Sequence, residues 1–522
     1  MNIALLVLVA LNPAPNPAGV YSPAHLRESV EGRWEGFLAP PDREGERFEL
    51  IVNVVDGNTL RGSLAVALDF SPIVGTYDPN EERIAFTADF DDPDLIKLDL
   101  RLDDGKLKGT VRKGDIQIEI TAERMSGEPE FYHDSGFTLP VNRPIYVEKS
   151  GLSGPTSALL NEIVGDAMDR LYAVGVSTAV IIDGRIADVR HFGWENFDAD
   201  IAASEKTMYR WASIAKPLTG VVATQLIQEG LLDPDEDVRK YVPEFPQKKY
   251  TVSSEQLLTH TGGIVHYSNG EVIETKRKYD VDHPSGDRIL SLDKFKESPL
   301  IAAPGTRYSY SSHGYVLLGA VLERASGARF EHLAASRVLR PLSMESMQPD
   351  YRWIEIEHRA VGYRGSRIGL ASHDTHEDVG WKLPAGGWIS TAHDLARFAA
   401  GLLSDELLNP DAKAKMFARG RLTDGTEIGY GYGIGMFKLA GCEVYAHSGQ
   451  QKAASTYLLI CPEDGNGVVV MSNTKNFESD QLGRLIFSEL LATKEALATL
   501  VLGCQDSSYT PRPSATRFTN AK

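Results

Sequence analysis

Residues 209–220 read Tyr-Arg-Trp-Ala-Ser-Ile-Ala-Lys-Pro-Leu-Thr-Gly and contain a Ser-x-x-Lys pattern, Ser213 to Lys216. An apolar run follows at 218–227 and predicts a buried helix that begins near the pattern. Because residues three apart share one face of a helix, the lysine amine can lie beside the serine hydroxyl. Serine becomes a good nucleophile when a neighbouring base takes its proton. This stretch therefore indicates a nucleophilic serine at the start of a buried helix.

The four-residue pattern is weak evidence by itself, because it recurs at 291–294 and 472–475. Taken alone, it also fits a helix N-cap serine followed by a solvated lysine. Ser213 differs by its context, since two aromatic residues precede it and Gly230 closes the helical run. The interpretation therefore depends on what the rest of the chain supplies.

Length and charge limit the number of domains and the classes of partner. A chain of 522 residues predicts two or three domains. Hydrophobic residues make up 42% and charged residues 24%, as in folded soluble proteins. A net charge of -18 argues against nucleic acid and against anionic membrane surfaces as partners.

The N-terminus carries an apolar run at 3–11, followed by a Pro/Ala-rich stretch that ends at Gly19. The run has the size of a signal-peptide core and is too short to span a bilayer. We therefore expect a signal peptide at 1–18 and a periplasmic or secreted protein without stable membrane insertion after its removal. The first basic side chain is Arg27, so a merely apolar N-terminal arm is the alternative.

The remainder divides by its hydrophobic pattern. Residues 28–124 alternate between short apolar segments and turns, which predicts a small antiparallel barrel or sandwich. It shows no paired catalytic residues, so an accessory domain is expected and a binding module is the alternative. A linker is expected at 125–150 and a disordered tail at 498–522.

Residues 151–497 mix helical and strand patterns. A hairpin is predicted at 177–189, and further strands near the end of the domain. This order predicts an α/β (α+β) domain whose two ends meet in one sheet. The other expected elements are helices at 156–172, 315–325, 391–403 and 478–493, and strands at 443–447, 455–460 and 467–471.

Three ordered motifs appear in this domain: Ser213 to Lys216, then Tyr310-Ser311-Ser312, then His447-Ser448-Gly449. Their order resembles the serine β-lactamase-like family, with class C β-lactamases, penicillin-binding proteins, family VIII esterases and D-amino-acid peptidases. Within it, the closest likeness is to LACTB-type serine hydrolases. The flanks at 257–264, 304–307 and 384–392 resemble family segments too.

The resemblance implies a set of roles. Ser213 attacks an acyl carbon, and Lys216 and Tyr310 share the proton transfer, with the lysine cation lowering the pKa of the tyrosine. The oxyanion hole is expected at the backbone N–H groups of Ser213 and Gln450. The substrate-binding residues are expected to be Ser312, Ser448, Gly449 and Gln450, and His447 completes the catalytic set. No cofactor and no metal are expected.

Several positions depart from the family pattern. Ser312 stands where many relatives have Asn, which weakens the expected contact to a substrate amide. His447 replaces a lysine that recognises a carboxylate, so strong β-lactamase activity is less expected than esterase or peptidase activity. The segment after the motif lacks the usual glycines, although Lys452 could restore a cation. Pro217 is expected to remove one helix hydrogen bond.

Other interpretations stay open. Taken singly, Tyr310 also fits a buried core tyrosine and His447 a strand histidine. The polar loop at 373–378 contains His373 and His376 and could hold a catalytic metal. A catalytically decayed binding protein is a third possibility, and an α/β-hydrolase is disfavoured because no Gly-x-Ser-x-Gly occurs.

The prediction is a serine hydrolase that forms an acyl-enzyme on a small ester, amide or D-peptide-like substrate. Pocket shape chooses among these substrates, and the sequence does not show it. Cys442 and Cys461 flank a predicted hairpin and could form a cross-strand disulfide, whereas Cys504 has no evident partner.

Overall fold

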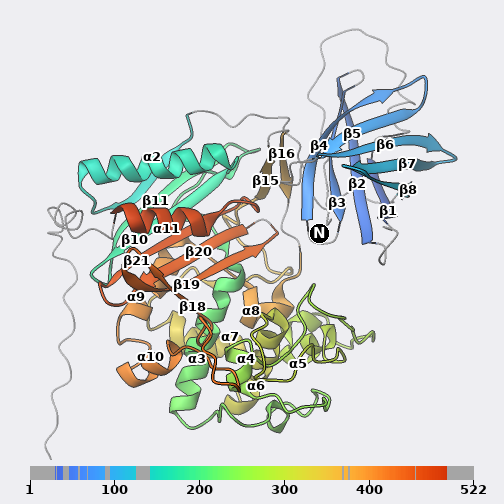
Figure 1. The fold of residues 1–522 in the computed structure, drawn as a ribbon. Helices are drawn as coiled ribbons and strands as arrows, with labels where there is room; N and C mark the ends of the chain where they lie inside the picture. The colour runs from blue at the N-terminus through green and yellow to red at the C-terminus, as the bar shows by residue number, and fades with distance from the viewer. Residues whose placement is uncertain are drawn as a thin grey trace, which may run out of the picture.

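The computed structural model describes residue 30 and residues 32–38, 46–56, 59–66, 69–88, 95–124, 142–366, 369–373, 377–452 and 454–490. It contains a small β-domain followed by a larger mixed domain (Figure 1). The predicted signal peptide, the predicted tail, Cys504 and most of the predicted linker lie outside the described residues.

The β-domain is a closed antiparallel barrel. Its eight strands follow one another in space as in sequence, and β8 pairs back onto β1. In β6 the side chains of Ile96, Leu98 and Leu100 point into the barrel while Lys97 faces outward, as a half-buried strand requires. The strands are β1 (Gly32–Leu38), β2 (Glu46–Asp56), β3 (Thr59–Val66), β4 (Asp69–Asp78), β5 (Arg83–Ala88), β6 (Ile96–Asp103), β7 (Lys106–Lys113) and β8 (Ile116–Arg124).

The larger domain is built on one antiparallel sheet of order β12-β11-β10-β21-β20-β19-β18, with β9 also paired to β11. Strands from the start and the end of the domain lie side by side at β10 and β21, which confirms the predicted fold class. The strands are β9 (Ile145–Ser150), β10 (Gly175–Ile182), β11 (Arg185–Asn196), β12 (Ile201–Ala202), β18 (Gly435–Leu439), β19 (Cys442–Gln451), β20 (Ala454–Cys461) and β21 (Asn466–Ser472).

Strand β9 corrects one expectation, because it lies inside the range predicted as linker. Its residues 145–147 are largely exposed, so the strand carries little hydrophobic signal. What defines it is the backbone pairing with β11, from Ile145↔Phe192 to Ser150↔Asp188. A pairing of this kind cannot be read from a local pattern.

Helices cover both faces of the sheet (Figure 1). Helices α2 (Gly154–Arg170) and α11 (Ser479–Leu490) contact each other, and α11 packs on β20 and β21. Helix α9 (Ala392–Leu403) packs against β10, β20 and β21 and joins the sheet to the helical layer. That layer contains α3 (Ala215–Gln228), α4 (Ser254–Leu258), α5 (Arg288–Ser291), α6 (Ser312–Ser326), α7 (Phe330–Ala334), α8 (Leu383–Gly386) and α10 (Pro410–Met416).

Helix α3 lies at the centre of the helical layer, and every residue from 215 to 224 is buried. A helix that is buried all round needs neighbours on every side, which α6, α8 and α10 supply. Pro217 is its third residue, where a backbone N–H has no partner within the helix. The expected loss of a helix hydrogen bond at Pro217 therefore does not arise.

The barrel contacts the larger domain through β4. This strand packs against the hairpin of β15 (Gly362–Ser366) and β16 (Gly369–His373), which lies between the two domains in Figure 1. The hairpin is tied to the main sheet, because the backbone of Tyr363 bonds to both Asn473 and Lys475. The chain continues from this hairpin into the segment at 377–388, which borders the candidate site.

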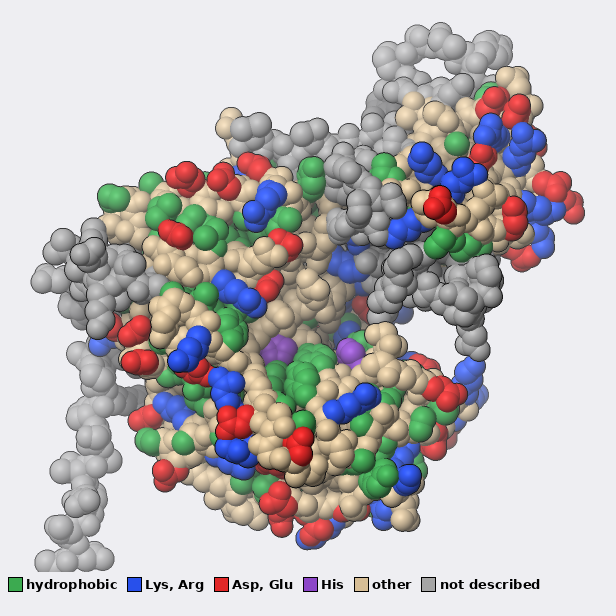
Figure 2. Space-filling view, viewed as in Figure 1, with side chains coloured by type: hydrophobic (Ala, Val, Ile, Leu, Met, Phe, Trp, Pro, Cys, Tyr) green, Lys and Arg blue, Asp and Glu red, His purple; other side chains and the backbone are tan. Residues whose placement is uncertain are grey.

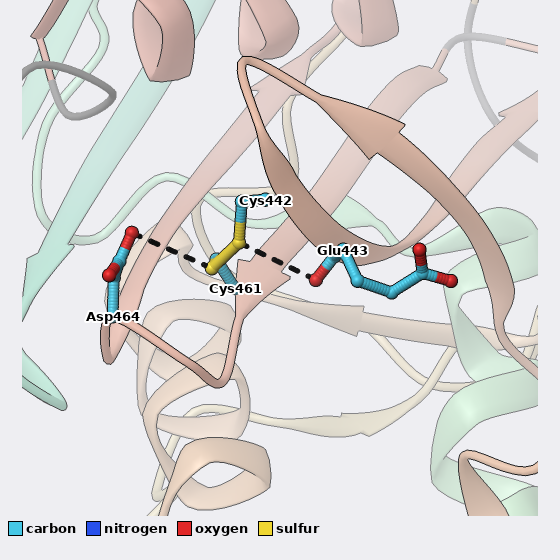
Figure 3. Close-up of a disulfide and its surroundings, with 4 residues drawn as sticks. All are labelled: Cys442, Glu443, Cys461 and Asp464. Carbon is cyan, nitrogen blue, oxygen red and sulfur yellow. Dashed lines mark hydrogen bonds between the residues drawn. A yellow bond between two sulfur atoms is a disulfide. The ribbon is translucent and has the colours of Figure 1, made fainter.

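A disulfide joins Cys442 on β19 to Cys461 on β20, as the sequence allowed (Figure 3). Within the described ranges, one group of three potential metal ligands lies close together: Cys442, Cys461 and Asp464. The two sulfur atoms of this group are bonded to each other. None of the helices described combines the length and apolar character needed to cross a bilayer.

Candidate active site

Ser213 lies in a single 3-10 turn, η1 (Ala212–Ile214), between β13 (Tyr209–Arg210) and α3. Trp211 anchors the turn: its backbone N–H donates to the carbonyl of Trp388, and its carbonyl accepts from the Thr456 hydroxyl at 2.9 Å. Ala212 then adopts φ 48°, a left-handed conformation that is uncommon outside glycine. Tertiary contacts thus hold the chain in a strained conformation one residue before the serine.

Lys216 lies in the first turn of α3 and is fully buried. Its Nζ is 3.1 Å from the Ser213 hydroxyl, 3.2 Å from the Ser312 hydroxyl and 3.0 Å from the carbonyl of Ala385. Burial, with a smaller contribution from the charge of Lys382, holds the pKa of Lys216 well below its usual 10.5. A neutral amine has a lone pair, so Lys216 can accept the proton of Ser213.

Tyr310 lies in the loop before α6 and is half-buried. The Lys216 Nζ is 4.8 Å from the centre of its ring. Burial raises the pKa of Tyr310 above its usual 10, and hydrogen bonds with the Ser213 and Ser312 hydroxyls only partly oppose this. The sequence predicted that a lysine cation would lower this pKa. Instead, desolvation disfavours the charged forms of both groups, so burial favours a neutral amine and a neutral phenol.

His447 lies on β19 and is also neutral. Its Nδ1–H donates to the carbonyl of Ser448 at 2.6 Å, and its Nε2 accepts from the Tyr430 hydroxyl at 2.9 Å. Burial and the nearby Lys216 lower the pKa of His447 to about 3, although the Ser448 carbonyl acts in the opposite direction. With both nitrogens engaged and the ring uncharged, His447 supplies no cation for a carboxylate.

Strand β19 passes directly beside the turn that carries the serine. A Cβ at Gly449 would lie 2.4 Å from the Trp211 carbonyl oxygen, so only glycine permits this approach. The side chains of Ser448 and Gln450 flank this glycine and are exposed. The predicted oxyanion residues Ser213 and Gln450 therefore come from two segments that are in contact.

The predicted second motif is positioned by two histidines. The backbone N–H of Ser312, the first residue of α6, donates to His266 Nδ1 at 3.2 Å, and that of Ser311 donates to His260 Nδ1 at 3.1 Å. Both histidines are kept neutral, because burial lowers the pKa of His266 to about 3 and that of His260 well below 6.5.

The mouth of the site is aromatic. Tyr308 is 41% exposed and Tyr267 37% exposed, and both have raised pKa values because of burial. Figure 2 shows histidine surfaces on either side of an apolar group in the hollow at the centre of this face. At the rim, Glu377 interacts with both Lys382 and Lys452, so the cation expected from Lys452 is offset by a carboxylate.

The other Ser-x-x-Lys patterns have structural roles. Ser291 donates to the carbonyl of Asp287, and Lys294 pairs with Glu274 at 3.4 Å. Ser472 donates to the carbonyl of Gly175 within the sheet. The alternative metal loop falls mostly outside the described residues, because these include neither 374–376 nor the side chain of His373.

The structure brings together all eight predicted site residues, and it adds partners that the sequence did not single out. These are Tyr430, His260, His266 and the carbonyl of Ala385. The segments at 257–264 and 384–392 resembled the family, but a backbone acceptor has no residue-type signal. Tyr430 lies in an alternating Gly/Tyr stretch at 429–433, which is outside the three motifs.

Residues 160–491 match the family model described as Beta-lactamase. The mitochondrial serine beta-lactamase-like protein LACTB of Homo sapiens is 26% identical over 332 residues, covering 52% of this chain and 56% of that protein. The chain thus spans about half the length of this relative.

Solved structures show the same fold. The octameric penicillin-binding protein homologue from Pyrococcus abyssi aligns with a TM-score of 0.55 at 23% identity, covering 65% of this chain and 78% of that one. The D-amino acid amidase from Ochrobactrum anthropi SV3, complexed with D-phenylalanine, aligns with a TM-score of 0.54 at 20% identity, covering 66% and 99%. Since the family model also matches more than half of the chain, the chain belongs to the serine β-lactamase-like family.

Proposed function

We propose that this protein is a serine hydrolase that forms an acyl-enzyme on Ser213 and releases the acyl group to water. The observation that carries this proposal is the Lys216 amine, which is buried, has a depressed pKa and contacts the hydroxyls of Ser213 and Ser312. A neutral amine at hydrogen-bond distance from a serine meets the geometric and acid–base requirements of a general base.

In the proposed acylation step, Lys216 accepts the Ser213 proton while the serine oxygen bonds to the carbonyl carbon. Negative charge develops on the carbonyl oxygen, and the backbone N–H groups of Ser213 and Gln450 are assigned to stabilise it. Collapse of the intermediate breaks the bond to the leaving group. Because Tyr310 keeps its phenolic proton, we assign it to protonate that group, and Lys216 then returns the serine proton to Tyr310 through the Ser312 hydroxyl.

Deacylation repeats the transfer with water in place of the serine. The Lys216 amine, neutral again, accepts a proton from the attacking water, and the Ser213 oxygen leaves with a proton returned from Lys216. The same groups therefore serve both half-reactions.

We propose that the substrate is an ester or amide without a carboxylate, including amides of D-amino acids, rather than a β-lactam. A neutral His447 with both nitrogens engaged offers no cation for a β-lactam carboxylate. Tyr267 and Tyr308 offer an apolar and aromatic surface to a substrate side chain. The structural neighbour named as a D-amino acid amidase supports an amide as one candidate.

The test is hydrolysis of a chromogenic short-chain ester, D-phenylalanine amide and a cephalosporin reporter by the wild-type protein and by Ser213→Ala. We expect turnover of the ester and the amide, little turnover of the cephalosporin, and loss of all activity in the variant. A fluorophosphonate probe should label the wild-type protein at Ser213, as located by mass spectrometry of the digest.

Two results would change the assignment. Turnover that survives Ser213→Ala and disappears with EDTA would favour a metal site at His373 and His376. Absence of both turnover and labelling would favour a binding protein with a decayed site.

We also propose that the protein is exported to the periplasm or secreted, after loss of residues 1–18, with the barrel as an accessory domain. The disulfide between Cys442 and Cys461 supports an oxidising compartment. N-terminal sequencing of the protein recovered from a bacterial periplasmic extract tests this, and an intact Met1 in a cytosolic fraction would contradict it.

A further inference from the structure

His260 is hydrogen-bonded to the backbone on both sides of Tyr310. It follows the short helix α4 and adopts a left-handed backbone, with φ 57°. Its carbonyl accepts the N–H of Ser309 at 2.8 Å, and its Nδ1 accepts the N–H of Ser311 at 3.1 Å. The residues before and after the tyrosine are thus hydrogen-bonded to the same residue, which restricts where the phenol can lie.

The imidazole ring also contacts Tyr310 directly. The two ring centres are 4.3 Å apart, and the His260 ring lies 4.8 Å from that of Tyr430. Tyr430 is the residue whose hydroxyl donates to His447. The His260 ring therefore contacts both the tyrosine of the second motif and the tyrosine that orients the histidine of the third.

The ring performs this role in its neutral form. Because Nδ1 accepts a hydrogen bond, the proton lies on Nε2, and this buried nitrogen has no hydrogen-bond partner among the described residues. The charged or titratable groups that act on it are Lys216, His266 and His447, and tyrosine rings surround it. A second proton would break the bond to Ser311.

Two features of His260 would not be expected of a residue with only a structural role. A buried N–H without a partner is unfavourable, and a left-handed conformation is uncommon for histidine. Asparagine adopts that conformation more readily, and an apolar residue would leave no polar atom unpaired. Both features point to a requirement for an acceptor and a ring at the same position.

We propose that His260 is a positioning residue that sets the place of the Tyr310 hydroxyl between Ser213 and Ser312. The proposal rests on the proposed function, because it assigns His260 an effect on proton transfer through Tyr310. His260 itself does not touch the reacting atoms.

The test separates the two features of the side chain. His260→Asn keeps an acceptor near the place of Nδ1 and tolerates the backbone conformation, but it removes the ring. His260→Phe keeps a ring and removes the acceptor. Rates of ester hydrolysis are measured per active site titrated with the fluorophosphonate probe, so that loss of folded protein does not enter the comparison.

We expect kcat per titrated site to fall about 10- to 100-fold in His260→Phe with KM nearly unchanged, since misplacing a reacting group by about 1 Å has effects of this size. His260→Asn should recover part of that loss. The decisive measurement is the double variant with Tyr310→Phe: if His260 acts through Tyr310, His260→Phe should cause little further loss in that background.

His358→Phe is the matched control. His358 also has a left-handed backbone, with φ 56°, and its carbonyl also accepts a backbone N–H, that of Met208 at 2.8 Å. It should cost stability without changing kcat per titrated site.

Three outcomes would overturn the inference: an unchanged kcat per titrated site in His260→Phe, full additivity with Tyr310→Phe, or an equal loss in His358→Phe. These outcomes leave the proposed function intact, because it depends on Ser213→Ala. If the wild-type protein neither hydrolyses the ester nor reacts with the probe, the proposed function fails and this inference fails with it.

Discussion

At the scale of single residues, desolvation dominates the chemistry of the site. Lys216 is buried against two hydroxyls and a carbonyl, and Tyr310 and His447 are neutral for the same reason. In a medium of low dielectric, a charged form without a counter-charge is disfavoured. Burial therefore favours the neutral forms of all three groups, as the proposed transfer of one proton among them requires.

Lys216→Arg should lower kcat/KM for the ester about 100- to 10,000-fold, because a guanidinium stays protonated and cannot serve as a base. Steady-state kinetics and circular dichroism measure the loss and check the fold. Lys294→Arg is the matched control, since it changes the lysine of another Ser-x-x-Lys pattern that pairs with Glu274 at the surface. Retention of activity within about tenfold by Lys216→Arg would exclude Lys216 as the base.

The pH dependence of kcat/KM follows from the same shifts. Lys216 must be deprotonated to act, and its lowered pKa places the acid limb well below 10.5, with activity falling as pH falls through it. Tyr310 must stay protonated, and its raised pKa places the alkaline limb above 10. His447, with a pKa of about 3, should add no limb near neutral pH. A titration near pH 6.5 that disappears in His447→Gln would contradict this assignment.

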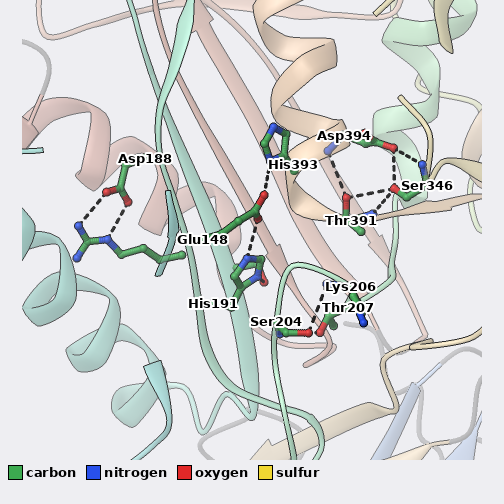
Figure 4. A network of polar contacts seen from close by, with 12 residues as sticks. Glu148, Asp188, His191, Ser204, Lys206, Thr207, Ser346, Thr391, His393 and Asp394 are labelled. Atoms are coloured by element: carbon green, nitrogen blue, oxygen red, sulfur yellow. Dashed lines mark hydrogen bonds and ion pairs between the residues drawn. The ribbon is translucent and has the colours of Figure 1, made fainter. Parts of the chain in front are cut away.

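At the scale of elements, the edge strand β9 is attached to the domain by a carboxylate. Glu148 on β9 accepts from His191 Nε2 on β11 at 3.0 Å and also contacts His393 on α9 (Figure 4). His191 Nδ1 lies 2.9 Å from the Ser177 hydroxyl, which donates to the Tyr209 hydroxyl at 3.0 Å. This network ties the start of the domain to the stretch that carries Ser213.

Glu148→Gln should lower the free energy of unfolding by on the order of 2 to 3 kcal/mol at neutral pH, measured by urea denaturation. Burial alone would raise the pKa of Glu148, but hydrogen bonds with His191 and His393 outweigh it and lower the pKa to about 2. A carboxyl with a lowered folded-state pKa stabilises the protein above its unfolded value of 4.5, and this contribution is lost as pH falls toward 2.

The difference between wild type and variant should therefore shrink between about pH 4.5 and pH 2. Glu162→Gln, on the exposed side of α2, provides the control and should change stability by less than about 0.5 kcal/mol. A Glu148→Gln effect that stays constant across this pH range would show that the carboxylate charge is not involved.

At the scale of the whole molecule, the barrel has its own core. Its buried residues form a cluster separate from the two large clusters of the larger domain, and contact between the domains runs through β4 and the β15–β16 hairpin. Domains with separate cores and a limited interface can unfold separately. We therefore expect two transitions in calorimetry of the full chain.

Trp34→Ala tests this expectation, because Trp34 is fully buried inside the barrel. Loss of such a side chain costs about 3 to 5 kcal/mol, so only one of the two transitions should move to lower temperature. The fluorophosphonate labelling rate at Ser213 should stay unchanged. A single transition that shifts as a whole would show that the two domains unfold as one unit.

The sequence determined what depends on local pattern and on motif order. Alternating strands predicted a small barrel or sandwich, and the structure forms the barrel. The hairpin predicted at 177–189 is formed by β10 and β11, and helices α6 and α9 lie where periodicity placed them. The three motifs identified the family, because each supplies a residue type that the chemistry requires. These features could be predicted because side-chain period and residue type are written in the chain itself.

Only the tertiary structure decided the protonation states and the supports of the site. The sequence could not show that burial favours the neutral forms of Tyr310 and Lys216, or that the Tyr430 hydroxyl donates to His447 Nε2. Nor could it show that His260 accepts hydrogen bonds from both neighbours of Tyr310. It also could not show that β9 belongs to the sheet. Desolvation and hydrogen bonds to backbone atoms depend on which distant segments come together, and no local pattern encodes that.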